Sequence, residues 1–503
     1  MALPNYDPRS SSNSRGTEQP THTPETIKDP LLENTPLGVD KEPPLDELLK
    51  DAQLEHPGEP ATADTPAGRT TIDEARRKGP LGWFQLLGPG LVTGASDDDP
   101  SGIGTYSQVG SQFGFGLLWT ALFTFPLMIA VQELCARIAL QTGVGLGVAL
   151  RRKFPTALIG LSVLALLIAN TFNLGADLGA VAAGGSLLTR GAIPTIWLVI
   201  PAAALVLFVQ FFMTYTTLFK VFKWLTVALF AYVITVFIVH PSLTTLVVST
   251  LVPHFEFTPE FTMALVAVLG TTISPYLFFW QASSEVDVMR AAGKATEEER
   301  RNSSQSKAEL YAARVDITVG MFFSQLVMYS IIATSAAVLH AHGKTDIQTA
   351  EQAASALAPL AGPFAFVLFG VGIIGTGLLA IPILSGSAAY AIKEFFGWKG
   401  ALSVKPKYRP TFYGIIALAT VVGVIMNLVH LDAIKALFYS AVINGVVAPP
   451  LLVLITLLGS DRSVMGAETS GLLSRIFTWA AAALMGAAAL LLIFFIATGQ
   501  VHP

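Results

Sequence analysis

The chain has 503 residues, of which 52% are hydrophobic and only 13% are charged, and its mean hydropathy is +0.57. A soluble protein of this length could not bury so much apolar surface, so the composition indicates a polytopic membrane protein. The formal net charge of −4 gives no basic excess for a nucleic-acid partner, and the single cysteine, Cys135, excludes an internal disulfide and a cysteine-based metal cluster.

The first 80 residues differ in composition from the rest of the chain. They are rich in Pro, Thr, Ser, Asp and Glu and show no sustained apolar period. Such a segment cannot bury enough surface to offset the entropy lost on ordering. We therefore expect a disordered cytoplasmic tail over residues 1–80 and a transmembrane domain over residues 81–503. The tail is either a simple tether, which its composition favours, or a regulatory segment, and no protein partner is predicted.

Apolar runs of about 18–28 residues follow from Leu86 onward, separated by short polar links. This is the length that a helix needs to cross the hydrocarbon core of a lipid bilayer. The pattern predicts an all-α protein with eleven membrane-spanning helices. Their expected ranges are 86–111, 115–140, 156–185, 194–213, 221–241, 260–285, 315–341, 361–391, 410–429, 434–458 and 472–498.

The links carry Lys and Arg unevenly, which predicts the orientation because cytoplasmic loops are enriched in these residues. Basic clusters precede the first and fifth helices and follow the second, sixth and eighth. The links on the opposite side contain only Arg190, Lys344 and Lys435. We expect a multi-pass protein of the cell membrane with its N-terminus in the cytoplasm and residues 501–503 outside.

The first helix contains an unusual polar stretch over residues 94–102, Gly-Ala-Ser-Asp-Asp-Asp-Pro-Ser-Gly. A charged side chain at the bilayer centre costs roughly 2.5–3.5 kcal/mol on insertion scales. The carboxylates of Asp97, Asp98 and Asp99 must therefore face water, a cation or one another. The alternative interpretation is a proline kink in which an Asp caps the following half-helix.

The sixth helix is interrupted over residues 270–276, Gly-Thr-Thr-Ile-Ser-Pro-Tyr. A proline inside a helix removes one backbone hydrogen bond, and neighbouring small hydroxyl residues can satisfy the groups that it frees. Two interrupted helices at matching positions of two five-helix halves are typical of a transporter built from inverted repeats, with its substrate site between the breaks.

The residues at the two breaks favour a cation, since they include three carboxylates and no Lys, Arg or His. The candidate ligands are all oxygen donors: Ser96, Asp97, Asp98, Asp99, Thr271 and Ser274. Oxygen ligands suit Mg²⁺, Ca²⁺ or Mn²⁺ better than softer transition metals. Mg²⁺ leads because it keeps several of its waters while it touches one or two carboxylates.

These residues resemble the NRAMP family of divalent-metal transporters, from about Gly88 to the end of the eleventh helix. The family's first-helix pattern, Gly-Pro-Gly and nine further residues that end in the Asp of Asp-Pro-Gly-Asn, aligns without a gap on residues 88–102. Its sixth-helix pattern, Gly-Ala-Thr-Val-Met-Pro-His, aligns on residues 270–276. Its third-helix pattern, Ala-Thr-Asp-Leu-Ala-Glu, resembles residues 175–180 more weakly.

The resemblance implies a LeuT-type fold, in which helices 1–5 and 6–10 are inverted repeats, helices 1 and 6 are broken, and one helix is added. It also implies that the protein is a transporter and not an enzyme, with the metal ion as substrate and no cofactor. Asp99 retains the family's metal-binding Asp, but Gly102 replaces its Asn and Ser274 replaces its soft Met. The thioether is lost, as in the NRAMP-related magnesium transporter branch, which the chain resembles most.

The family associates proton coupling with residues that are altered here. Tyr276 stands in place of the sixth-helix His, and Ala180 stands in place of a third-helix Glu. A tyrosine titrates near about pH 10 and does not exchange protons readily at neutral pH. Asp177 remains, either as part of a relay or as a carboxylate that is hydrogen-bonded within the bundle. Gly102, Tyr276 and Asp177 are therefore expected along the substrate pathway.

We expect import of Mg²⁺, with Mn²⁺ as a second substrate, by alternating access without proton coupling. The alternatives are a proton-coupled importer of Mn²⁺ or Fe²⁺ and, within the same fold, sodium-coupled uptake of a solute. A more distant alternative is an intramembrane aspartyl protease, which needs two aspartates that share a proton. Residues 175–177, Gly-Ala-Asp, lack the Gly-x-Gly-Asp pattern of that family.

Overall fold

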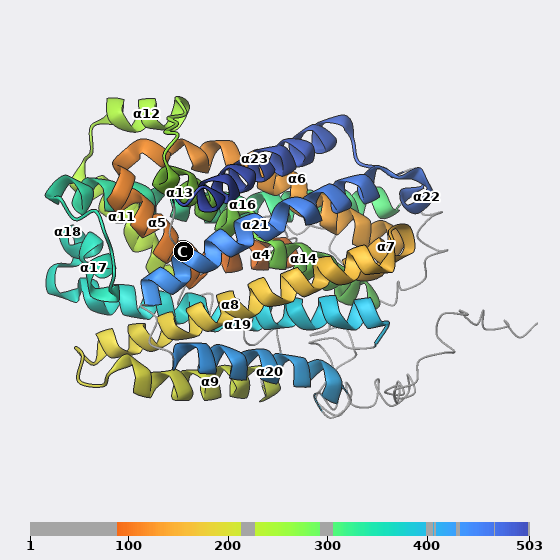
Figure 1. Ribbon diagram of the computed structural model, residues 1–503, viewed down its shortest axis with the longest axis horizontal. Helices are drawn as coiled ribbons and strands as arrows, with labels where there is room; N and C mark the ends of the chain where they lie inside the picture. Colours follow the sequence, from red (N-terminus) through yellow and green to blue (C-terminus); the bar gives the residue numbers. More distant parts are fainter. Residues whose placement is uncertain are drawn as a thin grey trace, which may run out of the picture. The chain divides into compact units, whose positions relative to one another are not determined.

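The computed structural model describes residues 88–212, 227–291, 305–398, 406, 409–428, 433–466 and 468–500. The expected tail over 1–80 and the expected outer terminus over 501–503 lie outside the described residues. The described chain forms α-helices and short 3₁₀ turns, with no strand among them (Figure 1). The all-helical class predicted from the sequence is therefore confirmed.

Nine helical stretches of the described chain are long and apolar enough to cross a membrane. Eight belong to α6 (Trp119–Thr142), α8 (Thr156–Leu188), α9 (Thr195–Phe212), α16 (Gln305–Val338), α19 (Ala365–Phe396), α20 (Pro410–Asn427), α21 (Ala433–Ser460) and α23 (Leu472–Ala497). The ninth combines α13 (Pro259–Thr272) with α14 (Pro275–Ala291). The first predicted helix corresponds to α4 (Pro89–Asp97) with α5 (Pro100–Phe113), and the described part of the fifth is α11 (Phe230–Val239).

Several short helices lie in segments that the sequence suggested were links. They are α7 (Leu146–Lys153), α12 (Leu243–Leu251), α17 (Ala350–Ala354), α18 (Ala358–Ala361) and α22 (Arg462–Met465). Each is nine residues or shorter, which is too short to cross a bilayer. The predicted membrane topology is therefore unaffected by them.

Both predicted helix breaks are present. α4 ends at Asp97 and α5 begins at Pro100, while α13 ends at Thr272 and α14 begins at Pro275. A proline has no N–H to donate and is favoured at the first position of a helix, so each proline begins a new helix. The two residues that precede each proline are not helical, and they are buried.

The long helices pack lengthwise against one another (Figure 1). α8 and α19 lie side by side, α9 and α20 pack beside them, and α4 contacts α16 and α14. Small residues allow the broken helices to approach their neighbours closely. A Cβ atom on Gly94 of α4 would collide with the backbone of Gly320 in α16, and one on Gly270 of α13 would collide with the backbone of Gly445 in α21.

The start of α4 is capped by a side chain from a helix far along the chain. Asp316 of α16 is buried and accepts hydrogen bonds from the backbone N–H groups of Gly88, Gly90 and Leu91, at 2.8–2.9 Å. The first N–H groups of a helix have no partner within the helix, and the positive end of its dipole favours a carboxylate. α16 therefore supplies the cap that the sequence around residue 88 lacks.

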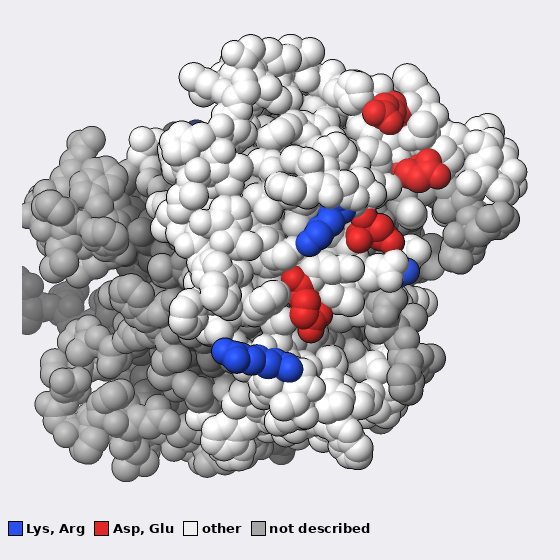
Figure 2. All heavy atoms as spheres, turned by 90° about the vertical axis from the view of Figure 1, so that its left-hand side faces the viewer, with Lys and Arg blue, Asp and Glu red and all other residues white. Residues whose placement is uncertain are grey.

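Large apolar side chains are exposed on several of the long helices, including Leu161 of α8, Trp197 and Phe212 of α9, Leu418 of α20 and Leu490 of α23. Water would not favour this surface, whereas the hydrocarbon of a bilayer would. Figure 2 shows the end of the molecule that carries α11, α17 and α18, where a few acidic and basic side chains lie among uncharged atoms. The protein is a multi-pass membrane protein.

Candidate substrate site at the paired helix breaks

Asp99 lies at the first break, and four hydrogen-bond donors surround its carboxylate. Oδ1 accepts hydrogen bonds from the backbone N–H of Gly102 and the hydroxyl of Ser101, both at 2.7 Å. Oδ2 accepts from the Asn173 amide at 3.1 Å and lies 3.4 Å from the Tyr276 hydroxyl. Only 1% of the residue is exposed. These hydrogen bonds therefore offset part of the free-energy cost of removing the carboxylate almost completely from water.

Local structure explains part of this geometry, because Asp99 is the N-cap residue of α5. Its backbone is extended and its side chain turns back to accept from the Gly102 N–H. An N-cap carboxylate satisfies one free N–H and interacts favourably with the helix dipole. The capping role that the sequence offered as an alternative and the buried position between helices thus occur in the same residue.

The hydrogen bonds leave the two Asp99 oxygens in different states. A carboxylate oxygen has about two acceptor sites, and two close donors fill both sites on Oδ1. Tyr276 has one hydroxyl hydrogen and donates it at 2.9 Å to the backbone oxygen of Ser96, a shorter contact than its 3.4 Å distance to Oδ2. Asp99 can therefore offer a ligand one oxygen, Oδ2, while Oδ1 stays bound within α5.

The second break supplies neutral oxygens opposite Asp99. The Thr271 hydroxyl lies 3.3 Å from that of Ser101, which in turn donates to Asp99. The Ser274 hydroxyl contacts the backbone oxygens of Gly270 and Thr271, at 3.0 and 2.7 Å, so it satisfies the free end of α13. Thr271 and Tyr276 are linked to Asp99 by hydrogen bonds, whereas Ser274 is bound to its own helix end.

The three consecutive aspartates face different parts of the bundle. The Ser324 hydroxyl of α16 lies 2.6 Å from a carboxylate oxygen of Asp97 and 3.5 Å from one of Asp98. Asp99 instead contacts α8 and α14. Within the described part of the chain, no three His, Cys, Asp or Glu side chains form a group that could hold one metal ion. A cation at Asp99 would thus meet fewer than three such side chains, together with neutral oxygens.

A side chain at position 102 would pack tightly against its neighbours. A Cβ atom there would lie 3.2 Å from the ring of Tyr106 and 3.4 Å from the Thr271 hydroxyl. Tyr106 itself contacts the Thr272 hydroxyl, at 3.2 Å. The space beside Asp99 is therefore closed by side chains from α5 and α13.

Two residues of α8 complete the surroundings of Asp99. Asp177 is fully buried, has Asp99 and the backbone of Ser101 among its neighbours, and makes no side-chain hydrogen bond that meets normal geometry within the described chain. Asn173, one helical turn earlier, contacts Asp99 directly. The sequence did not single out this asparagine as a site residue; its spacing of four from Asp177, which places both on one face of the helix, was the available signal.

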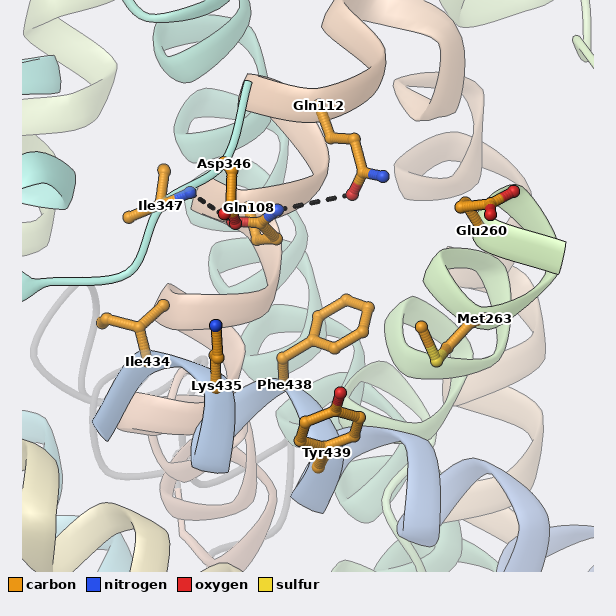
Figure 3. A pocket seen from close by; sticks show the side chains of 10 residues that line it. All are labelled: Gln108, Gln112, Glu260, Met263, Asp346, Ile347, Ile434, Lys435, Phe438 and Tyr439. Atoms are coloured by element: carbon orange, nitrogen blue, oxygen red, sulfur yellow. Dashed lines mark hydrogen bonds between the residues drawn. The ribbon is translucent and has the colours of Figure 1, made fainter. Parts of the chain in front are cut away.

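A cavity of about 190 Å³ lies near the other end of α5. Figure 3 shows side chains from α5, α13, α21 and the segment after residue 343 around it. Gln108 of α5 accepts a hydrogen bond from the backbone N–H of Ile347 and donates one to Gln112. Glu260, Asp346 and Lys435 add charged groups to the lining. Apolar side chains, such as those of Met263, Ile434 and Phe438, complete the lining, and Asp99 is not part of it.

Two broken helices that meet at buried polar groups are the central feature of the LeuT-type fold, and comparison with solved structures supports this fold. The manganese transporter of Eremococcus coleocola, solved with an aromatic bis-isothiourea substituted compound, matches with a TM-score of 0.66 at 16% identity, over 84% of this chain and 88% of that one. Mhp1, a nucleobase-cation-symport-1 family transporter in a closed conformation, matches with a TM-score of 0.51 at 16% identity, over 87% and 94%. The LeuT-type fold predicted from the sequence is confirmed.

The family model described as natural resistance-associated macrophage protein-like matches residues 90–495. The chain therefore belongs to the Nramp family, as the two helix breaks predicted. A divalent metal cation transporter MntH of Xanthomonas campestris is 28% identical over 80% of this chain and 90% of its own length. One of Deinococcus radiodurans is 25% identical over 84% and 92%. The protein is a transporter and not an enzyme, and the aspartyl protease hypothesis is set aside.

Proposed function

We propose that the protein imports Mg²⁺, with Mn²⁺ as a second substrate, by alternating access and without proton coupling. The observation that carries the proposal is the set of donors around Asp99. They are one carboxylate oxygen and neutral oxygens from the two breaks, and serine replaces the family's thioether at position 274. Hard oxygen donors suit Mg²⁺ and Mn²⁺ and give no preference to softer metals.

A single available carboxylate oxygen suits an ion that keeps part of its hydration shell. Mg²⁺ dehydrates reluctantly and is commonly bound through one or two carboxylates with several waters, whereas Ca²⁺ accepts six to eight oxygens, often from bidentate carboxylates. Asp99 provides one inner contact at Oδ2, because hydrogen bonds occupy Oδ1. Asp97 and Asp98, which face α16, then act through their charge or through water.

The predicted orientation of the protein in the membrane suggests how the cavity near Gln108 is used. With the N-terminus in the cytoplasm, α5 runs outward from the break, and the cavity opens on the outer side. Gln108 follows Asp99 by nine residues, which is about 13 Å along a helix. We assign this cavity as the outer access to the site. The inside-negative membrane potential favours entry of a divalent ion by roughly 4.6 kcal/mol per 100 mV.

The absence of proton coupling is proposed from the residue that replaces the family's histidine. Tyr276 donates its hydrogen to the Ser96 backbone oxygen, and a phenol does not exchange protons readily at neutral pH. The second candidate function is proton-coupled import of Mn²⁺ or Fe²⁺. The names of the relatives favour manganese as the substrate, since they are called divalent metal cation transporter MntH and a manganese transporter.

The purified protein in proteoliposomes separates the two candidates. The vesicles contain a Mg²⁺ or Mn²⁺ indicator together with a pH dye, and an inside-negative potential is imposed. We expect entry of Mg²⁺ without acidification, and we expect Asp99→Ala to abolish it because the only inner-sphere carboxylate is removed. Entry of Mn²⁺ alone, with Mg²⁺ neither transported nor competing, would overturn the magnesium assignment.

The variant Ser274→Met tests the hardness of the site in the same vesicles. A thioether at this position adds a soft ligand, so inhibition of Mg²⁺ entry by Cd²⁺ is expected to occur at about tenfold lower Cd²⁺ concentration. Ser283→Met, further along α14 from the break, is the matched control and is expected to leave the Cd²⁺ sensitivity unchanged. An unchanged Cd²⁺ sensitivity in Ser274→Met would place residue 274 outside the cation site.

A further inference from the structure

Asn173 connects the carboxylate of the first break to the tenth predicted helix. Its amide nitrogen donates to Asp99 Oδ2 at 3.1 Å, and its amide oxygen lies 2.7 Å from the hydroxyl of Ser440 in α21. All three residues are buried. One side chain of α8 thus joins the α4 and α5 break to α21.

Hydrogen-bond chemistry fixes the direction of this connection. An ionised carboxylate accepts hydrogen bonds and cannot donate, so Asn173 must present its NH₂ group to Asp99. Its oxygen then faces Ser440, whose hydroxyl must be the donor. The same hydroxyl lies 2.7 Å from the backbone oxygen of Leu437. Because a serine has one hydroxyl hydrogen, Ser440 can support either Asn173 or its own helix, but not both fully.

The position of Asn173 also decides how Asp99 meets a ligand. The amide occupies one side of Oδ2, while α5 holds Oδ1. The carboxylate cannot rotate to offer both oxygens without the loss of these bonds. A carboxylate held in this way gives one oxygen to a cation and disfavours bidentate binding.

We propose that Asn173 is a positioning residue that, together with the Ser101 and Gly102 donors on Oδ1, holds Asp99 in one-oxygen contact with the transported cation, and that Ser440 makes the contribution of Asn173 depend on the position of α21. The inference rests on the proposed function, because it explains how the Asp99 site would select hydrated Mg²⁺ over Ca²⁺. Movement of Ser440 away from Asn173 would remove the hydrogen bond to the amide oxygen of Asn173 and would weaken the positioning of Asp99 by the amide nitrogen.

The test measures uptake of Mg²⁺ and Ca²⁺ by the full-length protein in proteoliposomes. For Asn173→Ala we expect the KM for Mg²⁺ to rise about tenfold, the size of effect expected from one charge-assisted hydrogen bond, with a smaller change in maximal rate. We also expect Ca²⁺ to compete about tenfold better. Ser440→Ala should move both quantities in the same direction, about threefold, and Ser440→Thr, which keeps the hydroxyl, should restore them.

Asn170→Ala is the matched control, because Asn170 is buried one turn earlier on α8 and its amide lies 3.5 Å from the Leu384 backbone oxygen of α19. It should leave the competition between Mg²⁺ and Ca²⁺ unchanged. The proposal would be overturned if Ca²⁺ competed with Mg²⁺ equally well in Asn173→Ala and in Asn170→Ala. It would also be overturned if Asn173→Ala folded with the wild-type unfolding temperature and its Ca²⁺ competition did not change.

Failure of the proposed function gives a different result. If the wild-type protein carries Mn²⁺ and not Mg²⁺, the same variants are measured with Mn²⁺. A tenfold rise in the KM for Mn²⁺ together with stronger Ca²⁺ competition would support Asn173 as the positioning residue even though the magnesium assignment is wrong. An unchanged KM for Mn²⁺ would overturn the positioning role as well.

Discussion

The two helix breaks have the same backbone plan but different chemistry. Each consists of a helix, two non-helical residues and a proline that begins the next helix. At the first break one carboxylate, that of Asp99, caps α5. At the second the freed backbone groups are satisfied by the neutral hydroxyl of Ser274. One break therefore supplies the charge, and the other supplies neutral oxygens.

The half-helices that lead into the breaks are also held differently. α13 is capped locally, because the hydroxyl of Thr258 accepts from the Phe261 N–H. α4 is capped from α16 by Asp316. A local cap moves with its helix, whereas a distant cap ties two helices together. α4 therefore depends on α16 for the satisfaction of its first turn, whereas the cap of α13 comes from its own segment of chain.

The largest expected effect comes from removal of the distant cap. Asp316→Ala leaves the N–H groups of Gly88, Gly90 and Leu91 without their acceptor, and we expect a loss of about 3 kcal/mol in the free energy of unfolding. Thr258→Ala, which removes the local cap of α13, should cost about 1 kcal/mol. Thermal unfolding in detergent measures both. Equal losses would mean that the two caps contribute alike and would remove the contrast between α4 and α13.

A smaller effect is expected from the contact between α4 and α16. Gly94→Ala places a methyl group against the backbone of Gly320, so the helices must separate. We expect a loss of about 2 kcal/mol in the free energy of unfolding. Gly414→Ala in α20 is the matched control, because a Cβ atom there meets nothing within 4 Å, and alanine favours a helix over glycine. A neutral Gly94→Ala would show that α4 is not tightly held against α16.

The smallest effect is expected at an exposed ion pair outside the membrane-spanning helices. The hydrogen bond from the Lys153 ammonium, together with those from Ser463, lowers the pKa of Asp461 to about 2. Because this pKa is lowered in the folded state, the stabilisation is present above about pH 4 and is lost as the pH falls to about 2. Lys153 is partly exposed, so Lys153→Met should not measurably change the unfolding temperature at pH 7. A drop of several degrees would contradict this.

The fold could be predicted from the sequence because its signals are local. Apolar length locates the helices, and Pro100 and Pro275 locate the breaks, since each residue acts on its own segment of backbone. The directions of the three aspartates could not be predicted in the same way. Asp97 and Asp98 turn to Ser324, and Asp99 turns to Asn173, because α16 and α8 both pack against the broken helix.

The partners that matter most at the site are distant in sequence. Asn173 precedes Asp177 by one helical turn, but nothing in that spacing identifies Asp99 or Ser440 as its neighbours. Asp316 likewise reads as an isolated carboxylate at the start of an apolar run. Such pairs depend on which helices pack together and on how the helices are aligned along their axes. Hydrophobic periodicity in the sequence gives information on neither.

The Asp316 cap makes the opening of α4 observable in the exchange of backbone hydrogens. The amide hydrogens of Gly88, Gly90 and Leu91 are bound by one carboxylate, and their position at the start of the helix gives them no partner in a preceding turn. They are protected from deuterium only while α4 lies against α16. The three amide hydrogens should therefore exchange with deuterium at the same rate, and this rate would report how often the two helices separate.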